Sequence, residues 1–187
     1  MLSFIGQYVI DDVSVCDELI EYHKNSNLKT IGQTSNGISP VEKISTDVTI
    51  DINGNHEVVN KYLTELEKVC NKYVDQYKFC NEYDPWKITE NINIQHYKPN
   101  EGYFEWHTER TSSKNPISHR HLAFMTYLND VNDSGETEFY YQELKIKPVK
   151  GLTLIWPVDW THTHRGVTSP TEEKYIITGW YNFTDRK

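Results

Sequence analysis

The chain has 187 residues, of which 37% are hydrophobic and 13% aromatic, and a net charge of −8 from 27 acidic and 19 basic side chains. This length fits a single domain over residues 1–187, in which aromatic rings supply much of the buried apolar surface. The acidic balance argues against a nucleic-acid or anionic-membrane partner, and no apolar run approaches the ~20 residues of a membrane span. The N-terminus lacks the basic region of a signal peptide, and the three scattered cysteines favour free thiols, so we expect a cytoplasmic protein.

The first part of the chain predicts two helices. Asp12 or Ser14 is a candidate N-cap for a short helix. Residues 25–55 are rich in Ser, Asn, Thr and Gly, which predicts loops and a strand. A longer helix is predicted over residues 56–79, because apolar side chains recur there at three- and four-residue steps. We expect this stripe to pack on a sheet; it contains Val59, Tyr62, Leu63, Leu66, Val69, Tyr73 and Tyr77.

From about residue 88 the sequence changes to the pattern of short strands. Alternating, β-branched and aromatic residues are separated by turns. Strands are predicted over residues 88–97, 103–107, 121–129, 137–141, 152–156 and 174–183. We therefore expect an α+β domain around a β-sandwich or barrel, with helical support from residues 1–87 and a β-core over about 88–187.

Within this β-core, His107 and Glu109 form a candidate metal-binding pair. Residues i and i+2 of a strand point to the same face, so both side chains can bind one ion. A chain with 8 His and 27 acidic residues is expected to contain about one such pair by chance, so the pair alone is weak evidence. A second histidine from a distant strand would complete a two-histidine, one-carboxylate set that leaves coordination positions open. By spacing alone, His162 and His164 are both candidates.

Lys174 begins a strongly apolar strand ten residues after His164. A lysine in this position is usually a solvated strand end. If it faces the barrel, it is a desolvated cation that requires an anionic partner. A dicarboxylate that chelates the metal at one end would supply that anion at the other.

Residues from about 91 to 183 resemble the iron(II)- and 2-oxoglutarate-dependent dioxygenases, in particular the prolyl 4-hydroxylase-like branch. The matching blocks keep the order and spacing of the family pattern. They are Gln95 and Tyr97 before a Pro/Gly turn and Tyr103, the pair His107 and Glu109, Arg120 leading into Tyr127-Leu128-Asn129, Gly135-Glu136-Thr137, Pro148, Gly151, Trp156-Pro157, His164-Arg165-Gly166, Lys174, and Gly179-Trp180.

The resemblance implies a double-stranded β-helix, a jelly-roll or cupin-like barrel, flanked by N-terminal helices. It also implies that His107, Glu109 and His164 ligate iron(II), and that Lys174 pairs with the distal carboxylate of 2-oxoglutarate. The His-Arg-Gly pattern and the ten-residue interval to Lys174 favour His164 over His162. Further positions match residues that line the cosubstrate pocket or face a peptide substrate: Tyr97 and Thr137 for the pocket, and Arg120 for the substrate.

Two residues and one loop need separate comment. Glu109 stands where most of the branch has aspartate, and we keep it as a ligand because it still offers a hard oxygen donor. Trp180 is expected to belong to the core rather than to the site. The polar loop over residues 110–118 is a candidate lid over the substrate.

The implied activity is hydroxylation of an unactivated C–H bond, foremost that of a prolyl residue in a peptide or protein. Iron(II) is the cofactor, 2-oxoglutarate and O2 are cosubstrates, ascorbate is a candidate reductant, and succinate and CO2 are released. Two other readings remain open at this point: hydroxylation of a free amino acid or another small molecule, and a non-catalytic β-barrel binding module. The sequence determines neither the primary substrate nor the oligomeric state.

Overall fold

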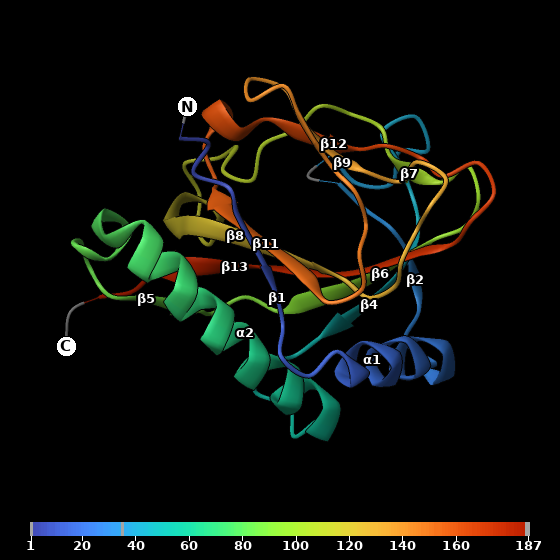
Figure 1. Ribbon diagram of the computed structural model, residues 1–187, viewed down its shortest axis with the longest axis horizontal. Helices are drawn as coiled ribbons and strands as arrows, with labels where there is room; N and C mark the ends of the chain where they lie inside the picture. The colour runs from blue at the N-terminus through green and yellow to red at the C-terminus, as the bar shows by residue number, and fades with distance from the viewer. Residues whose placement is uncertain (1, 35, 186–187) are drawn as a thin grey trace.

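The computed structural model describes residues 2–34 and 36–185, which form a β-barrel covered on one side by helices (Figure 1). The larger sheet has eight strands, seven of them in the order β1-β11-β8-β13-β6-β4-β2, and the eighth, β5, pairs with the C-terminal end of β13. Its strands are β1 (Gly6–Val9), β2 (Thr30–Ile31), β4 (Thr46–Ile50), β5 (Trp86–Ile88), β6 (Ile92–Tyr97), β8 (Arg120–Tyr127), β11 (Leu152–Pro157) and β13 (Lys174–Phe183).

A smaller layer lies opposite this sheet. It consists of a three-stranded sheet in the order β10-β9-β12 and a two-stranded pair, β3 with β7. Their bounds are β3 (Lys43–Ile44), β7 (Gly102–Tyr103), β9 (Thr137–Phe139), β10 (Leu144–Ile146) and β12 (His164–Gly166). The two antiparallel layers confirm the predicted double-stranded β-helix, and the side chains between them form the interior of the barrel.

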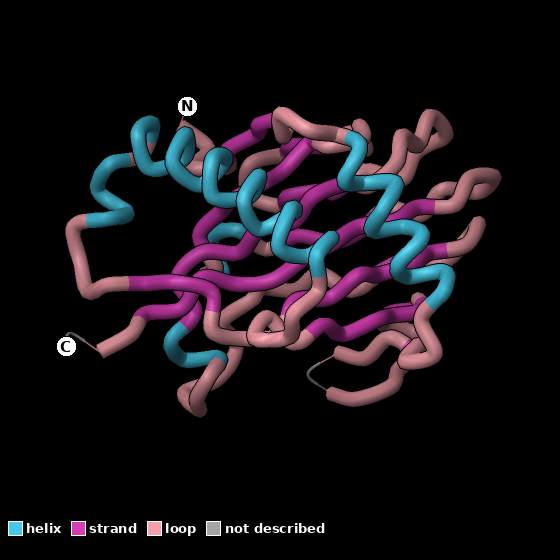
Figure 2. The backbone as a smooth tube through the Cα atoms, turned by 90° about the horizontal axis from the view of Figure 1, so that it is seen from below, coloured by secondary structure: helices cyan, strands magenta, loops and turns pink. Residues whose placement is uncertain are grey.

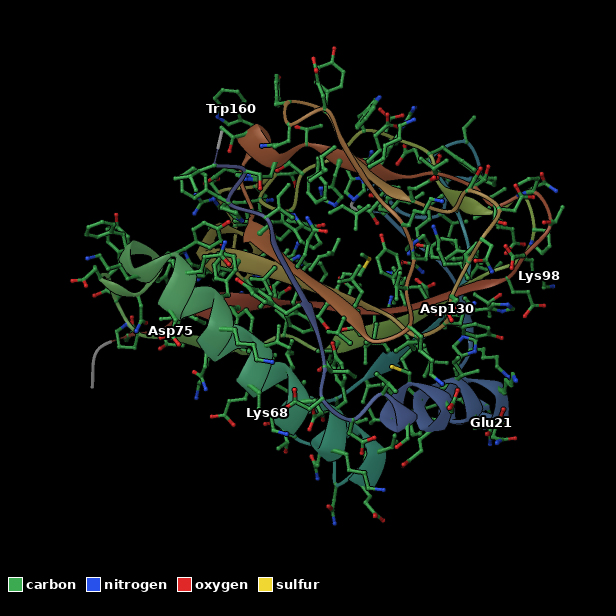
Figure 3. The ribbon with its side chains drawn as sticks, viewed as in Figure 1. Glu21, Lys68, Asp75, Lys98, Asp130 and Trp160 are labelled. Carbon is green, nitrogen blue, oxygen red and sulfur yellow. The ribbon has the colours of Figure 1, made fainter. Side chains whose placement is uncertain are left out.

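Two helices cover the outer face of the larger sheet (Figure 2). They are α1 (Ser14–Asn25) and α2 (Glu57–Gln76), and the 3-10 turn η1 (Lys78–Asn81) follows α2. The apolar stripe of α2 packs on the sheet as predicted, with Val59, Tyr62 and Leu66 at most 1% exposed. Charged side chains such as Glu21, Lys68 and Asp75 point away from the sheet (Figure 3). None of the helices in residues 2–34 and 36–185 has the length and apolar character needed to cross a membrane.

The predicted cap of the first helix is wrong in detail. Val13 occupies the N-cap position of α1 and has no side-chain capping hydrogen bond. The carboxylate of Asp12 instead accepts hydrogen bonds from the backbone N–H and hydroxyl of Ser14, at 3.0 and 2.6 Å. Asp12 therefore accepts from Ser14, the first residue of the helix. A capping side chain would instead accept from a backbone N–H further into the first turn.

Alternation along the central strands divides the side chains between two cores. On β13, Tyr175 and Ile177 pack under the helices, whereas Ile176 packs inside the barrel. On β8, Phe124 faces the helices and Met125 faces the barrel interior. Because both faces of these strands are buried, their sequences read as nearly continuous apolar runs.

The remaining differences from the predicted elements concern short strands. The predicted strand over residues 103–107 is reduced to β7, and the strands that were not predicted separately are β1, β2, β3, β5, β10 and β12. His107 nevertheless forms an isolated antiparallel bridge with His164. Segments of so few residues, or a single bridge, are too short to produce a clear period-two pattern.

Candidate active site

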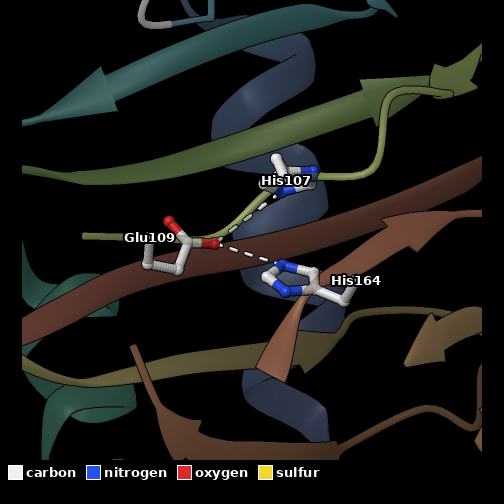
Figure 4. Close-up of side chains that lie close together, drawn as sticks. All are labelled: His107, Glu109 and His164. Atoms are coloured by element: carbon white, nitrogen blue, oxygen red, sulfur yellow. Dashed lines mark ion pairs between the residues drawn. The ribbon is translucent and has the colours of Figure 1, made fainter. Parts of the chain in front are cut away.

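His107 and His164 are brought together by their backbones. The N–H of each residue donates to the carbonyl oxygen of the other at 2.9 Å. This reciprocal pair connects the loop after β7 to the beginning of β12, and the two imidazole rings lie 4.3 Å apart between centroids. Glu109 lies two residues after His107, and its carboxylate faces both rings (Figure 4).

Backbone contacts also determine which nitrogen of each ring is available to a ligand. Nδ1 of His107 lies 2.9 Å from the carbonyl oxygen of Glu105, and Nδ1 of His164 lies 2.9 Å from that of His162. A carbonyl only accepts, so each Nδ1 carries the proton and each Nε2 keeps a lone pair. These Nε2 atoms lie 3.8 and 3.2 Å from Oε1 of Glu109. This donor set, in which all three ligand atoms lie within 4.8 Å of one another, fits a divalent transition metal.

The charges of this group are set by burial and by the neighbouring side chains. Burial lowers the pKa of His107 to about 3, and the charge of His164 acts in the same direction. Burial alone would raise the pKa of Glu109, but the hydrogen bond and charge of His164, the charge of His107 and the N–H of Trp180 lower it to about 2. At neutral pH the group therefore contains an ionised carboxylate and an unprotonated His107, the forms that coordinate metal.

Lys174 lies in the barrel interior and is only 4% exposed. Its Nζ donates to the carbonyl oxygens of Gly135 at 2.9 Å and Val167 at 3.2 Å. Among residues 2–34 and 36–185, no carboxylate oxygen lies within 4 Å of this ammonium group. Burial lowers its pKa to about 8, and the charge of Glu136 only partly opposes this effect. Lys174 is thus a buried cation whose charge has no direct counter-ion within the described part of the chain.

One cavity of about 370 Å³ joins the candidate ligands to Lys174. All residues predicted for the site line it: His107, Glu109, His164, Lys174, Tyr97, Thr137 and Arg120. The strand register explains part of this arrangement, because Lys174 on β13 pairs directly with Tyr97 on β6. The hydroxyl of Thr137 accepts a hydrogen bond of 2.6 Å from Tyr127, which fixes it in the same wall.

His162 lies outside the metal-binding group. Its Nε2 lies 3.0 Å from the carbonyl oxygen of Ser3, and its Nδ1 lies 3.0 Å from the hydroxyl of Thr161. His162 therefore connects the N-terminal segment to the turn before β12, while its own carbonyl oxygen holds Nδ1 of His164. The group that the described residues place around one point contains His164.

Arg120 lies at the cavity but is already paired. Its guanidinium group makes two hydrogen bonds to Glu90, of 2.9 and 2.7 Å, and its Nη1 donates to the main-chain oxygen of Glu109 at 2.9 Å. The guanidinium carbon also lies 3.5 Å from the centroid of the Trp180 ring. A contact of Arg120 with a peptide substrate remains a prediction.

Three further features of the site were not predicted. Trp180 borders the barrel core, as expected, but it also lines the cavity, and its Nε1 donates to Oε2 of Glu109 at 2.8 Å. The ring of Tyr103 stacks on that of His107, with centroids 3.7 Å apart and planes within 8°. Lys43 also lines the cavity, and its ammonium group lies 2.8 Å from the carboxylate of Asp47. Of these, Tyr103 and Trp180 appeared in the family pattern, whereas nothing in the local sequence distinguishes Lys43.

The polar loop over residues 110–118 has two contacts with the cavity. Thr111 and Ile117 line it, one near each end of the loop. Arg110 anchors the beginning of the loop through a two-oxygen ion pair with Asp159, at 2.6 and 2.8 Å. This placement is compatible with a lid, and that role remains a prediction.

A double-stranded β-helix with two histidines and a carboxylate facing an internal cavity defines the class of non-haem iron oxygenases. Residues 92–182, the β-core of the chain, match the family model of the 2OG-Fe(II) oxygenase superfamily. The protein is therefore a 2-oxoglutarate-dependent dioxygenase, whose cofactor is iron(II) and whose cosubstrates are 2-oxoglutarate and O2.

The fold is similar to that of solved prolyl hydroxylases. The viral collagen prolyl hydroxylase of Paramecium bursaria Chlorella virus 1 superimposes with a TM-score of 0.74 at 21% identity, and the match covers 97% of each chain. A Pseudomonas putida prolyl 4-hydroxylase superimposes with a TM-score of 0.73 at 16% identity, and the match covers 95% of this chain and 92% of that one. A Trichoplax adhaerens prolyl hydroxylase, solved with a hypoxia-inducible-factor peptide fragment, has a TM-score of 0.74 at 18% identity. This match covers 97% of this chain and 84% of that one. No match was found among curated protein sequences.

Proposed function

We propose that this dioxygenase hydroxylates an unactivated C–H bond of a prolyl residue in a peptide or protein. The observation that carries the proposal is a single cavity with two charge requirements. A three-residue metal-binding group lies in it together with Lys174, a buried cation that lacks a counter-ion among the described residues. A dicarboxylate bound to the metal meets both requirements at once.

In this proposal His107, Glu109 and His164 hold iron(II), and Lys174 pairs with the distal carboxylate of 2-oxoglutarate. When bound, the metal and its cosubstrate supply the oxidation, in which 2-oxoglutarate and O2 yield succinate and CO2 and one oxygen atom enters the substrate C–H bond. The protein supplies position and shielding. The carbonyl oxygens of Gly135 and Val167 hold the ammonium group of Lys174 in place.

Tyr97 and Thr137 are proposed to line the cosubstrate end of the cavity. Tyr97 is 3% exposed and lies beside Lys174, whose Nζ is 5.2 Å from the ring centroid. Thr137 is 6% exposed on β9 in the opposite layer. Walls of this kind exclude water from the carboxylate–ammonium pair, which strengthens that pair relative to the same contact in solvent.

The prolyl substrate is supported by the similarity to three prolyl hydroxylases, one of them solved with a peptide fragment. Loop residues outside the main strands also line the cavity, and these are Gln33, Thr34, Thr111 and Ile117. We place Arg120 at the substrate end. Hydroxylation of a free amino acid or another small molecule would use the same metal and cosubstrate, and the substrate screen described below distinguishes these cases.

The proposal also includes the domain organisation and the cellular location of the protein. We infer that residues 1–187 act as one oxygenase domain, because the helices and the larger sheet share a continuous buried core. We also infer a reducing, cytoplasmic location, which the three free cysteines Cys16, Cys70 and Cys80 support.

The function is tested first without the primary substrate. Anaerobic protein with iron(II) and 2-oxoglutarate should show a weak visible charge-transfer band, and admission of O2 should yield succinate. His107→Ala should lose the band, whereas His56→Ala, at the N-cap of α2 and outside the cavity lining, should keep it. A band and succinate yield unchanged in His107→Ala would refute the assignment of the metal site.

The substrate is then identified with a library of proline-containing peptides and a parallel set of free amino acids. A mass gain of one oxygen atom on a prolyl residue would support the proposal. Oxygen transfer confined to free amino acids would refute the prolyl substrate while leaving the dioxygenase intact. Metal binding without any succinate would indicate a binding module.

A further inference from the structure

The carboxylate of Glu109 has different partners at its two oxygens. Oε1 faces Nε2 of His164 and His107 at 3.2 and 3.8 Å. Oε2 accepts the hydrogen bond of 2.8 Å from Nε1 of Trp180. Because the indole N–H is a single fixed donor, it orients the plane of the carboxylate and leaves Oε1 toward the histidines.

Arg120 holds both members of this hydrogen bond. Its guanidinium group is stacked over the ring of Trp180, with 3.5 Å between the guanidinium carbon and the ring centroid. Its Nη1 donates to the main-chain oxygen of Glu109 at 2.9 Å and lies 4.0 Å from Oε2 of the same residue. The planar cation thus bridges the backbone of Glu109 and the indole that binds its side chain.

Glu90 fixes Arg120 in turn. It accepts from Nε and Nη2 of Arg120 at 2.9 and 2.7 Å, and the amide of Asn182 donates to Glu90 Oε1 at 2.8 Å. The side chains of Arg120 and Glu90 are only 12% and 13% exposed, so this two-bond pair is largely shielded from solvent.

The register of β8 and β13 places Arg120 in this position. Tyr181 pairs with Leu122, but the next residue, Asn182, pairs with Arg120, so β8 contains one extra residue, His121. A β-bulge of this kind redirects the side chains next to it. Here it brings Arg120 to the cavity beside Trp180, while His121 packs against Trp86.

We propose that Trp180 and Arg120, anchored by Glu90, form a carboxylate clamp that presents Oε1 of Glu109 as the single oxygen ligand of the metal. This inference rests on the proposed metal site, and it makes Trp180 and Arg120 positioning residues. A glutamate has one more rotatable side-chain bond than an aspartate, so its carboxylate loses more freedom when it is ordered. The clamp orders that carboxylate before the metal binds.

The clamp is tested by binding of Co(II) to the metal-free protein, without cosubstrate or turnover. Trp180→Phe keeps an aromatic ring under Arg120 but removes the N–H donor. Loss of a partner that orients a ligand typically costs about 10–100-fold in metal affinity, and we expect a loss of at least about tenfold. The visible Co(II) spectrum should also change, because a freed carboxylate can bind through both oxygens. The matched control, Trp160→Phe at an exposed indole, should leave both unchanged.

A double-mutant cycle separates the clamp from a merely structural effect. In Glu109→Asp the carboxylate is one methylene shorter and its second oxygen no longer reaches Nε1 of Trp180. Adding Trp180→Phe to that variant should therefore change Co(II) affinity less than about twofold. Glu90→Gln weakens the hold on Arg120, and it should lower affinity in the wild-type background and have a smaller effect in the Glu109→Asp background.

Two results would overturn the clamp. One is a Trp180→Phe variant whose Co(II) affinity and spectrum equal those of the wild-type protein. The other is a loss of Co(II) affinity on Trp180→Phe that is equally large in the wild-type and Glu109→Asp backgrounds. In both cases the wild-type protein still binds Co(II), so the proposed metal site stands. Failure of the wild-type protein to bind Co(II) or Mn(II) would refute the metal site and, with it, the clamp.

Discussion

Replacing Lys174 with methionine should stabilise the metal-free protein while removing its affinity for 2-oxoglutarate. Burial lowers the pKa of Lys174 from 10.5 to about 8. At about 1.36 kcal/mol per pKa unit, keeping this ammonium group charged in the folded protein costs about 3 kcal/mol at neutral pH. Lys174→Met removes the charge and retains an unbranched side chain that fits the same space.

The substitution also removes two hydrogen bonds. The carbonyl oxygens of Gly135 and Val167 lose their donor, at a cost of about 1 kcal/mol each. The balance predicts that the free energy of unfolding of Lys174→Met rises by about 1 kcal/mol at pH 7. The matched control is Lys43→Met, at a second buried lysine that lines the same cavity. Because Lys43 is paired with the buried carboxylate of Asp47, its loss should instead destabilise the protein by about 3 kcal/mol or more.

The assay is urea unfolding of the metal-free proteins, with and without 2-oxoglutarate and Mn(II). With Mn(II) present throughout, 2-oxoglutarate binds only the folded state, so its addition should stabilise the wild-type protein and leave Lys174→Met unchanged. Isothermal titration in the presence of Mn(II) measures the lost affinity directly. Destabilisation of Lys174→Met by several kcal/mol, as for Lys43→Met, would refute the reasoning. It would show that the charge of Lys174 is compensated within the folded chain.

The other predictions concern pH, the second histidine and the loop. The affinity for 2-oxoglutarate should fall about tenfold per pH unit above about pH 8, because only protonated Lys174 pairs with the carboxylate; titrations at several pH values would contradict this if the affinity were constant. The same depressed pKa should make the stability of the metal-free protein rise with pH between about 8 and 10.5, the range in which only the unfolded state holds this proton. His164→Ala should lose Co(II) binding, whereas His162→Ala should retain it and lower the melting temperature; the reverse result would reassign the ligand. Arg110→Ala removes the ion pair with Asp159 and should raise the KM for peptide without changing Co(II) affinity, and an unchanged KM would count against a lid.

Much of the fold could be predicted because the long elements have clear periods. The stripe of α2 and the apolar runs of β8 and β13 identify a helix on a sheet that is buried on both faces. The contact between Glu90 and Arg120 could not be predicted, for a physical reason. Glu90 and Arg120 are 30 residues apart, and Arg120 lies beyond the bulge at His121, where the register of β8 and β13 shifts. A bulge adds one residue to one strand, and the sequence pattern does not show where.

The structure brings His107 and Glu109 together, but not through the regular strand on which their prediction as a metal pair was based. The i, i+2 argument assumes a regular strand through His107 and Glu109, and the regular strand ends at Tyr103. The side chains converge because the backbone of His107 pairs with that of His164. This pairing depends on a contact between segments far apart in the chain, so spacing alone left His162 and His164 equivalent. Only the longer pattern, which includes the interval to Lys174, distinguished them.

The position of Trp180 at the cavity could have been predicted from the sequence. Once Lys174 is assigned to the barrel interior, the period of two along β13 assigns Ile176, Thr178 and Trp180 to the same face. The structure places all four at the cavity. Trp180 is the last residue of this row, and Arg120 covers one face of its ring. Its indole N–H still needs an acceptor, which is the ionised carboxylate of Glu109. In the proposed site, β13 therefore anchors the cosubstrate with its first residue and orients the metal ligand with its seventh, so a shift of one residue in the register of β13 would disable both ends of the site together.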